Sequence, residues 1–260
     1  MQISLDVLQA FLTRELGMSF WPFFRIAGVL MVAPVFGARL VPARVRIALC
    51  VAVTVIVSPL LPAAPQPLEL SFASGLVVAQ EVILGVAMGF CLQMIFDALI
   101  VAGQTIAMGM GLGLATMIDP QRGVAVPVIS QFFVILGTLI FLALGGHLAM
   151  IRLLADSFAI LPVGQPLSTD GVWQVVAWGS QMFAGAVRIA LPAVTALLIA
   201  NIAFGIMSRA APTLNLFAVG LPAGLLIGFV LLLLNIRHLS ALLAEFLESA
   251  LVAVANLLAA

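Results

Sequence analysis

The feature that most constrains this chain is the length of its apolar runs, which only a few charged residues interrupt. The stretch 172–208 is apolar apart from Arg188, and the stretch 70–118 contains only two charged residues, Glu81 and Asp97. A helix that crosses a bilayer needs about 20 apolar residues, because the hydrocarbon core is about 30 Å thick. As one helix with a rise of about 1.5 Å per residue, the first stretch would reach roughly 55 Å. These runs do not match bilayer-sized lengths.

Two arrangements would resolve the conflict for 172–208. The stretch could form two helices hinged between Arg188 and Pro192, or a helical hairpin that extends beyond the lipid. The stretch 70–118 poses the same problem, because Asp97 separates its two apolar parts and no polar turn lies between them.

Composition places the chain in the membrane class. Hydrophobic residues make up 64% and charged residues 8%, against roughly 45–50% and 25% in soluble domains. We therefore expect an integral membrane-type, all-α protein that contacts membrane lipid. The net charge is zero, so we expect no nucleic-acid partner.

No motif predicts an enzyme or a cofactor. Cys50 and Cys91 lie inside apolar runs, which favours packing as small hydrophobic residues over disulfide or metal bonding. His147 and His238 have no accompanying metal motif, and the sequence around Ser180, "WGSQ", lacks the second glycine of a nucleophile elbow.

The remaining segments follow the charges and prolines. We expect an amphipathic helix over 1–20, apolar segments over 20–37, 47–61, 98–118, 124–151 and 211–236, and a final helix from 239 to the end. The arginine-rich connection "ARLVPARVR" predicts a cytoplasmic loop, and "SPLLPAAPQPLEL" predicts an external one.

Four ionisable residues inside the apolar runs are candidate buried charges: Arg25, Glu81, Asp97 and Arg188. An unpaired charge at the centre of a membrane helix costs around 2.5–3.5 kcal/mol on insertion scales. Such residues could pair with one another, form an ion or proton path, or be satisfied by other subunits. The sequence leaves these alternatives open.

Glycines recur at four-residue spacing, which lets helix backbones approach closely. We expect helix contacts, some with other chains, at Gly85, Gly89, Gly220, Gly224 and Gly228.

The stretch "GQTIAMGMGLGLATMIDPQRG" runs from Gly103 to Gly123. Glycine costs about 1 kcal/mol in a helix relative to alanine, methionine adapts to irregular gaps, and a proline disfavours helix at the residue before it. One interpretation is a deformable apolar loop that seals an opening, and the other is a loosely packed interior helix. The candidate gate residues are Met108, Gly109, Met110, Gly111, Leu112, Gly113, Leu114, Met117, Asp119 and Pro120.

The order of several motifs resembles the FliR family of flagellar type III export-gate proteins, whose virulence counterpart is SctT. The motifs are "FFRIAGVLMVAPVFGARLVPARVRIALC", "EVILGVAMGF", "AGQTIAMGMGLGLATMIDPQRGVAVPVISQF", "FLALGGH" and "APTLNLFAVGLPAGLLIG". The resemblance covers nearly the whole chain. One departure is Ala223, where the family often carries a lysine.

The resemblance implies one export-gate subunit over 1–260 that assembles with FliP-like and FliQ-like subunits into a hetero-oligomeric cone of long kinked helices and helical hairpins. Residues 1–170 would be a FliP-like part, and residues 171–260 a FliQ-like hairpin plus a C-terminal helix. FlhB-like and FlhA-like export proteins would be further partners. The assembly would sit in the bacterial inner membrane at the flagellar basal body, partly on the periplasmic side.

By the same resemblance, the segment matching "AMGMGLGLATMIDPQRG" is a plug that opens for unfolded flagellar polypeptides. Two alternatives remain at this point. The chain could be an ion-coupled secondary transporter using Glu81, Asp97 and Arg188, although no internal repeat supports this. It could also be a scaffold that only helps its neighbours to assemble.

Overall fold

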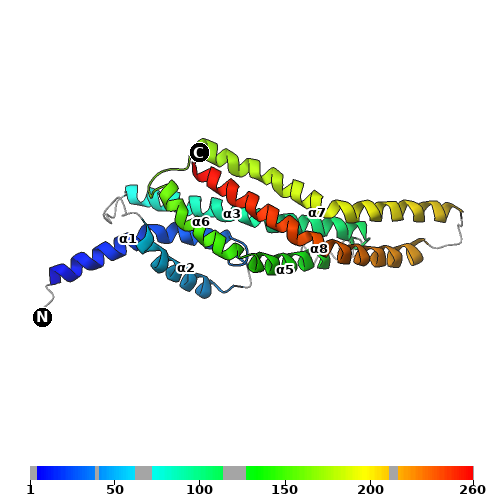
Figure 1. The fold of residues 1–260 in the computed structure, drawn as a ribbon, viewed down its shortest axis with the longest axis horizontal. Coiled ribbons are helices and arrows are strands. Elements are labelled where there is room, and N and C mark those ends of the chain that lie inside the picture. The colour runs from blue at the N-terminus through cyan, green and yellow to red at the C-terminus, as the bar shows by residue number, and fades with distance from the viewer. Residues whose placement is uncertain (1–4, 39–40, 62–71, 114–126, 211–215, 260) are drawn as a thin grey trace. The chain divides into compact units, whose positions relative to one another are not determined.

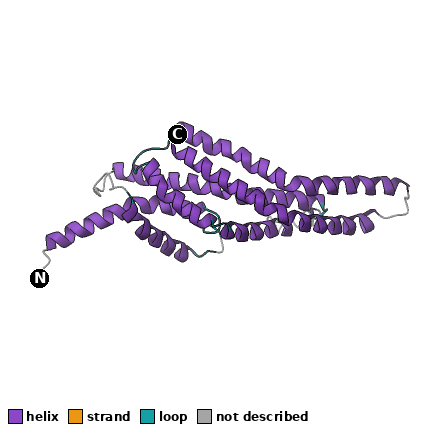
Figure 2. Cartoon of the chain, viewed as in Figure 1, coloured by secondary structure: helices purple, strands orange, loops and turns teal. Residues whose placement is uncertain are grey.

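The computed structural model describes residues 5–38, 41–61, 72–113, 127–210 and 216–259, and every regular element in these ranges is helical (Figures 1 and 2). The predicted all-α fold is confirmed for these ranges. The elements are α1 (Leu5–Val32), α2 (Ala43–Val57), the 3-10 helix η1 (Ser58–Leu60), α3 (Phe72–Gly109), α5 (Val128–Ala143), α6 (Gly146–Ile160), α7 (Thr169–Ala210) and α8 (Leu216–Ala259).

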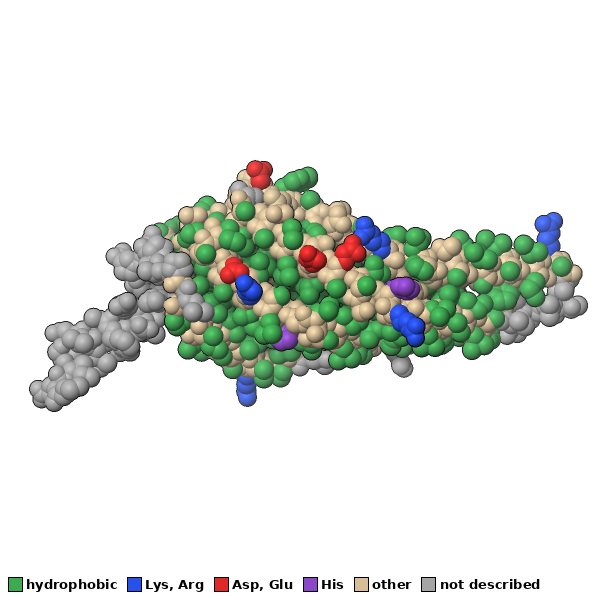
Figure 3. Space-filling view, in the orientation of Figure 1, with side chains coloured by type: hydrophobic (Ala, Val, Ile, Leu, Met, Phe, Trp, Pro, Cys, Tyr) green, Lys and Arg blue, Asp and Glu red, His purple; other side chains and the backbone are tan. Residues whose placement is uncertain are grey.

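The predicted membrane class is also confirmed. Three helices are long and apolar enough to cross a membrane, namely α3, α7 and residues Gly220–Ala259 of α8, and α5 with α6 would make a fourth span if counted together. Hydrophobic side chains cover much of the face shown in Figure 3. Exposed examples are Ile56, Leu226 and Leu233, each more than two-thirds exposed, as expected where lipid or another protein provides the surroundings.

The structure differs from both arrangements predicted for 172–208, namely two hinged helices or a hairpin within this stretch. Helix α7 is continuous over 42 residues and carries Pro192 inside it, so it is about 63 Å long at about 1.5 Å per residue. Helix α3 is likewise continuous over 38 residues and passes through Asp97. Proline removes only one helical hydrogen bond, and an apolar environment strongly favours keeping the others, because it offers no replacement partners.

Other expected boundaries also shift. Helix α1 continues through residue 20 and Pro22, and α8 continues through 236–239 as one helix of 44 residues. The run 124–151 instead divides, because Gly145 adopts a left-handed conformation with φ 71° between α5 and α6. Glycine tolerates that conformation because it has no Cβ.

The chain forms two compact units, and each combines segments that are distant in sequence. Unit 1 contains Met1–Gln93, Gly145–Gly179 and Ser249–Ala260, and unit 2 contains Met94–Leu144 and Ser180–Glu248. Helices α3, α7 and α8 contribute residues to both units.

Helices α7 and α8 form an antiparallel hairpin. In unit 1, a Cβ added to Gly171 would lie 3.0 Å from the carbonyl oxygen of Leu257. In unit 2, a Cβ added to Gly185 would overlap the ring of Phe246. As residue numbers increase along α7, the residue numbers of its contacts on α8 decrease, which is the arrangement of an antiparallel helical hairpin.

Candidate functional site: a buried charge cluster and the end of helix α3

The first candidate site begins with a close crossing of α1 and α3 in unit 1. A Cβ added to Gly28 would lie 2.6 Å from the carbonyl oxygen of Val82, and a Cβ added to Gly85 would overlap the carbonyl oxygen of Arg25. A Cβ added to Gly89 would lie 2.8 Å from the carbonyl oxygen of Val29. Only glycine permits such backbone contact, so these glycines bring the two helices of this chain together.

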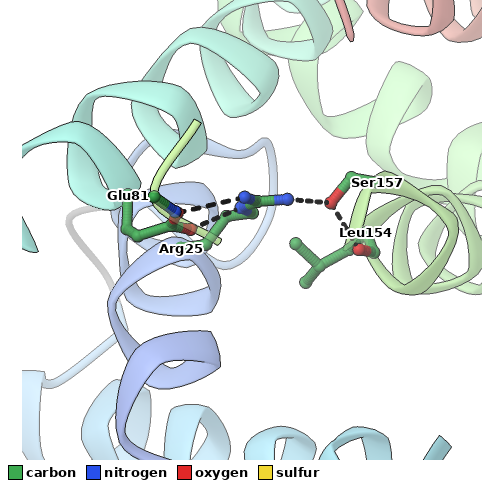
Figure 4. Close-up of polar contacts among 5 residues, drawn as sticks. Arg25, Glu81, Leu154 and Ser157 are labelled. Carbon is green, nitrogen blue, oxygen red and sulfur yellow. Dashed lines mark hydrogen bonds and ion pairs between the residues drawn. The ribbon is translucent and has the colours of Figure 1, made fainter. Parts of the chain in front are cut away.

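This crossing places Arg25 of α1 beside Glu81 of α3, as Figure 4 shows. The Nε atom of Arg25 donates to Oε2 of Glu81 at 2.7 Å, and its Nη2 atom donates to Oε1 at 3.2 Å. The two side chains are only 0% and 1% exposed. This two-point geometry matches the planar guanidinium to the carboxylate and is the strongest form of such a pair.

Two further segments complete the buried charge cluster, which we define as Arg25, Glu81, Ser157 and Gly164. The Nη1 atom of Arg25 donates to Oγ of Ser157 at 3.1 Å, and that hydroxyl donates to the carbonyl of Leu154 at 2.7 Å (Figure 4). The backbone N–H of Gly164 donates to Oε1 of Glu81 at 3.2 Å.

The ring of Phe158 lies 4.1 Å from the guanidinium carbon of Arg25, so the flat face of the cation is also covered. The cluster thus ties α1, α3, α6 and the connection after α6 together within unit 1. Both charges are matched by hydrogen bonds, as buried ions require.

The other two candidate charges behave differently. Asp97 is half-buried and has an interaction partner within the chain. Arg188 is not buried by its own chain: its side chain is 62% exposed and its Nη1 donates to Oε1 of Glu245, itself 63% exposed, at 3.3 Å. Its burial by another subunit stays a prediction. In the described part of the chain, the apolar neighbours Val187 and Leu191 on α7 are exposed as well.

These pairings bear on the transporter alternative. Glu81 is engaged by Arg25 and Gly164, and Arg188 is engaged by Glu245. Each of these proposed coupling residues thus has a partner within its own unit.

The second candidate site is the end of α3 in unit 2. Of the two interpretations of this stretch, residues 103–109 follow the interior helix, because α3 continues to Gly109. The N–H of Gly111 then donates to the carbonyl of Met108, and the N–H of Leu112 donates to the carbonyl of Ala107, both at 3.0 Å. Gly111 has φ 82°. This bond pattern, with a left-handed glycine, is a Schellman cap, which terminates a helix without leaving its last carbonyls unpaired.

Met110 lies just before this cap and is only 2% exposed. Its side chain occupies the space beside Gly228 of α8, where an added Cβ would lie 2.5 Å from both Cγ and Cε of Met110. At Gly224, one turn earlier, an added Cβ would lie 3.7 Å from the carbonyl oxygen of Met110, an ordinary contact. We call Met110, Gly224 and Gly228 the Met110 contact site.

The other candidate gate residues divide between described and undescribed parts of the chain. Met108 is 63% exposed, whereas Leu112 and Gly113 are half-buried. The amide of Asn201 on α7 donates to the carbonyl of Gly109 at 3.4 Å. Four predicted residues lie outside the described residues: Leu114, Met117, Asp119 and Pro120. Gly220 is described and half-buried.

Sequence reasoning missed several residues of both sites. Ser157 and Gly164 have no distinguishing pattern, because a single serine and a loop glycine are common in any sequence. Gly28 lies against Gly85 in the structure, but its spacing to other small residues in the sequence is not distinctive. Gly111 is among the predicted gate residues, but its role as a helix cap was missed, although glycine commonly follows the last turn of a helix.

Comparison with known proteins places the chain in a family. The family model described as "Bacterial export proteins, family 1" matches residues 16–250. The chain is 37% identical over 245 residues to the flagellar biosynthetic protein FliR of Escherichia coli (strain K12), covering 94% of this chain and 92% of that protein. It is 40% identical over 214 residues to FliR of Pectobacterium carotovorum, covering 82% of each chain. It is 36% identical over 216 residues to FliR of Aquifex aeolicus, covering 82% and 83%.

Proposed function

Because this chain belongs to the FliR family of bacterial export proteins, we propose that it is a core subunit of the flagellar protein export gate. Family membership and the apolar helices make it a membrane protein of the flagellar export apparatus. With FliP-like and FliQ-like subunits it would form a gated channel that carries unfolded flagellar proteins across the inner membrane. The proposed role is transport rather than catalysis, and the description of its family as bacterial export proteins supports it.

The observation that carries the gate is the apolar end of α3. From Ala98 to Gly113 no side chain is charged, and the helix ends in a defined cap directly before residue 113. We define the gate segment as residues 108–120. Its residues 108–118 carry no charge, and such a stretch can close a passage, because a polypeptide or an ion gains no charged partner from it.

The exposed surfaces support assembly with other chains. Helices α7 and α8 display large apolar side chains, among them Ile199, Ile206 and Leu226, each more than 60% exposed. Continuous apolar exposure on long helices marks contact with protein or lipid. We propose that the α7–α8 hairpin corresponds to a FliQ-like part and the residues before it to a FliP-like part, with FlhB-like and FlhA-like proteins as further neighbours.

The proposed mechanism is passive conduction. Unfolded substrates pass one chain at a time, and other components of the apparatus supply the energy. Methionine side chains of the gate segment, with neighbouring apolar residues, close around the path, because the unbranched, flexible methionine side chain adapts to irregular shapes. Part of the assembly would face the periplasm, since α7 alone is about twice as long as the roughly 30 Å hydrocarbon core.

Deletion of residues 113–118 tests this function in cells that carry the variant gene in place of the native one. We expect a higher leak of small ions through the membrane, because the closing segment is removed. The matched control is alanine at Gly205 of α7, where an added Cβ meets nothing within 4 Å. If the deletion variant is present at the native level and its ion leak is unchanged, the proposed gate function is wrong.

A further inference from the structure

A groove in unit 2 lies between α5, α7 and α8 and shares no residue with the buried charge cluster or the Met110 contact site. Its volume is about 360 Å³, within the range of about 300–1,000 Å³ found for small-molecule sites. Phe133 and Leu239, each 2% exposed, form its floor, whereas Pro192 and Leu234 on its rim are exposed. We call it the α7–α8 groove. It is open to the surroundings and has a fixed apolar base.

The lining of the α7–α8 groove changes from apolar to polar along α8. Leu231 and Leu234 line one end, and His238, two turns after Leu231, lines the other. Gly185 of α7 lies against Phe246 of α8. Because the two helices are antiparallel, Arg188 is therefore level with the His238 end of the groove. One end thus offers hydrocarbon and the other offers hydrogen-bond donors.

The polar end is suited to an anion. None of the residues that line this groove in the described part of the chain is acidic. The Asn235 side chain also lines the groove, and its Nδ2 donates one N–H to the carbonyl of Leu231 at 3.1 Å, which leaves a second N–H on that atom. Figure 3 shows arginine and histidine side chains near one another, with hydrophobic side chains around them.

The ion pair of Arg188 with Glu245 does not occupy the groove. Glu245 lines a separate, smaller hollow with Gly185 and Phe246, on the side of Arg188 away from Pro192. The pair uses Nη1 of Arg188 at 3.3 Å, and a guanidinium has five N–H donors in a planar fork. Arg188 can therefore bind a second anion from the groove side.

Charge-free stretches place this polar end at the level of a membrane interface. Residues 189–208 of α7 and 216–236 of α8 contain no charged residue, and each is about 20 residues long, the length that crosses the hydrocarbon core. Arg188, Arg237 and His238 border these stretches at one end, and Arg209 borders α7 at the other. Basic side chains at the ends of membrane helices reach the headgroup level.

We propose that the α7–α8 groove binds an anionic phospholipid. The lipid phosphate binds Arg188 and His238, and the first part of one acyl chain lies along the groove toward Leu231, over about 10 Å at 1.5 Å per residue. A groove that is cationic at the interface and apolar toward the hydrocarbon is complementary to such a lipid in both charge and polarity. Basic pockets between membrane helices are known to bind anionic headgroups, whereas a zwitterionic lipid would bring its own cation to the basic end.

Native mass spectrometry of the full-length protein in detergent tests the site. Phosphatidylglycerol and phosphatidylcholine with the same acyl chains are added in separate titrations, and we expect the first to bind more tightly. Arg188→Gln should weaken phosphatidylglycerol binding about tenfold or more, because a hydrogen bond between charged groups contributes at least that factor. The matched control is Arg237→Gln, which removes the same charge from an exposed position that does not line the groove, and it should leave the affinity nearly unchanged.

Two further variants separate the lipid from the ion pair. Glu245→Gln removes the partner of Arg188 but keeps the guanidinium, so we expect phosphatidylglycerol to bind as tightly as before or more tightly. Leu231→Trp fills the apolar end and keeps every charge, so it should weaken binding of the same lipid. A loss of affinity in Glu245→Gln as large as that in Arg188→Gln would mean that the ion pair shapes the groove and that the phosphate does not bind Arg188.

Three results would overturn the proposal. The first is equal affinity for the two lipids, and the second is an equal loss of phosphatidylglycerol binding in Arg188→Gln and Arg237→Gln, which would reduce the effect to general surface charge. The third concerns protein extracted from cells in its native assembly: if it retains no anionic phospholipid that Arg188→Gln loses, a neighbouring protein covers the groove. These measurements do not involve export or ion leak, so their outcome is independent of the proposed gate.

Discussion

Two arginine–glutamate pairs in this chain have the same chemistry and opposite surroundings. Arg25 and Glu81 lie in unit 1, almost fully buried, and share two hydrogen bonds. Arg188 and Glu245 lie in unit 2, more than 60% exposed, and share one contact at 3.3 Å. The buried pair also recruits a hydroxyl and a backbone N–H.

The difference shows that the importance of an ion pair to a fold depends on the free energy lost when one of the two partners is removed. A buried charge that loses its partner has no water to replace it, so breaking such a pair costs about 3–5 kcal/mol. An exposed pair contributes about 0–1 kcal/mol, because the medium screens it and the side chains lose freedom. The buried pair is therefore expected to hold unit 1 together, and the exposed pair is not expected to hold unit 2.

The largest effect should come from Glu81→Gln. This change leaves the Arg25 guanidinium buried without a counter-charge, and we expect the free energy of unfolding to fall by about 3–5 kcal/mol. Thermal unfolding of the purified protein in detergent measures it.

The control for this prediction replaces both charges, as Arg25→Met with Glu81→Leu. Removal of both ions avoids the stranded charge, so we expect stability to recover most of the loss. A double variant that is less stable than Glu81→Gln would mean that the pair itself, and not its imbalance, stabilises the crossing.

A smaller effect is expected from Ser157→Ala. The change removes the acceptor of one N–H of Arg25 but leaves the ion pair intact, so we expect a loss of about 1–3 kcal/mol. The exposed Ser240, whose hydroxyl donates to the carbonyl of Arg237 three residues earlier, provides the control as Ser240→Ala. Equal melting temperatures for the two serine variants would contradict the role of Ser157 in the cluster.

The smallest effect is expected from Glu245→Gln. The exposed pair with Arg188 should contribute less than about 1 kcal/mol, and added salt should reduce even that. Thermal unfolding with and without high salt measures both. A loss as large as that of Glu81→Gln would show that another chain or the lipid buries this pair, and the comparison between the two pairs would then no longer hold.

Hydropathy predicted the fold class and identified candidate charges, but it could not separate these two pairs. Arg25 and Arg188 both interrupt apolar runs. On α7 the residues beside Arg188, Val187 and Leu191, are apolar and yet each 57% exposed. When lipid or other subunits cover a helix, its outer face is apolar as well, so the pattern of the sequence does not report which side the chain itself buries.

The end of α3 shows a second limit of the sequence. Gly109, Gly111 and Gly113 look equivalent in a run of alternating glycines, and their helix propensity predicts a weak segment. In the structure only Gly111 has a positive φ, and it completes a helix cap. Which glycine takes that role depends on where the helix stops, and a run of alternating glycines does not indicate that point.

The sequence distance between the buried partners has a consequence for biosynthesis. Glu81 follows Arg25 by 56 residues, so at ribosomal rates of about 5–20 residues per second Arg25 is made roughly 3–11 seconds before its counter-ion. Ser157 arrives later still, 132 residues after Arg25. Entry of the lone arginine into hydrocarbon would be unfavourable during that interval. The first helix should therefore wait at the membrane surface or inside the insertion machinery until the third helix has left the ribosome.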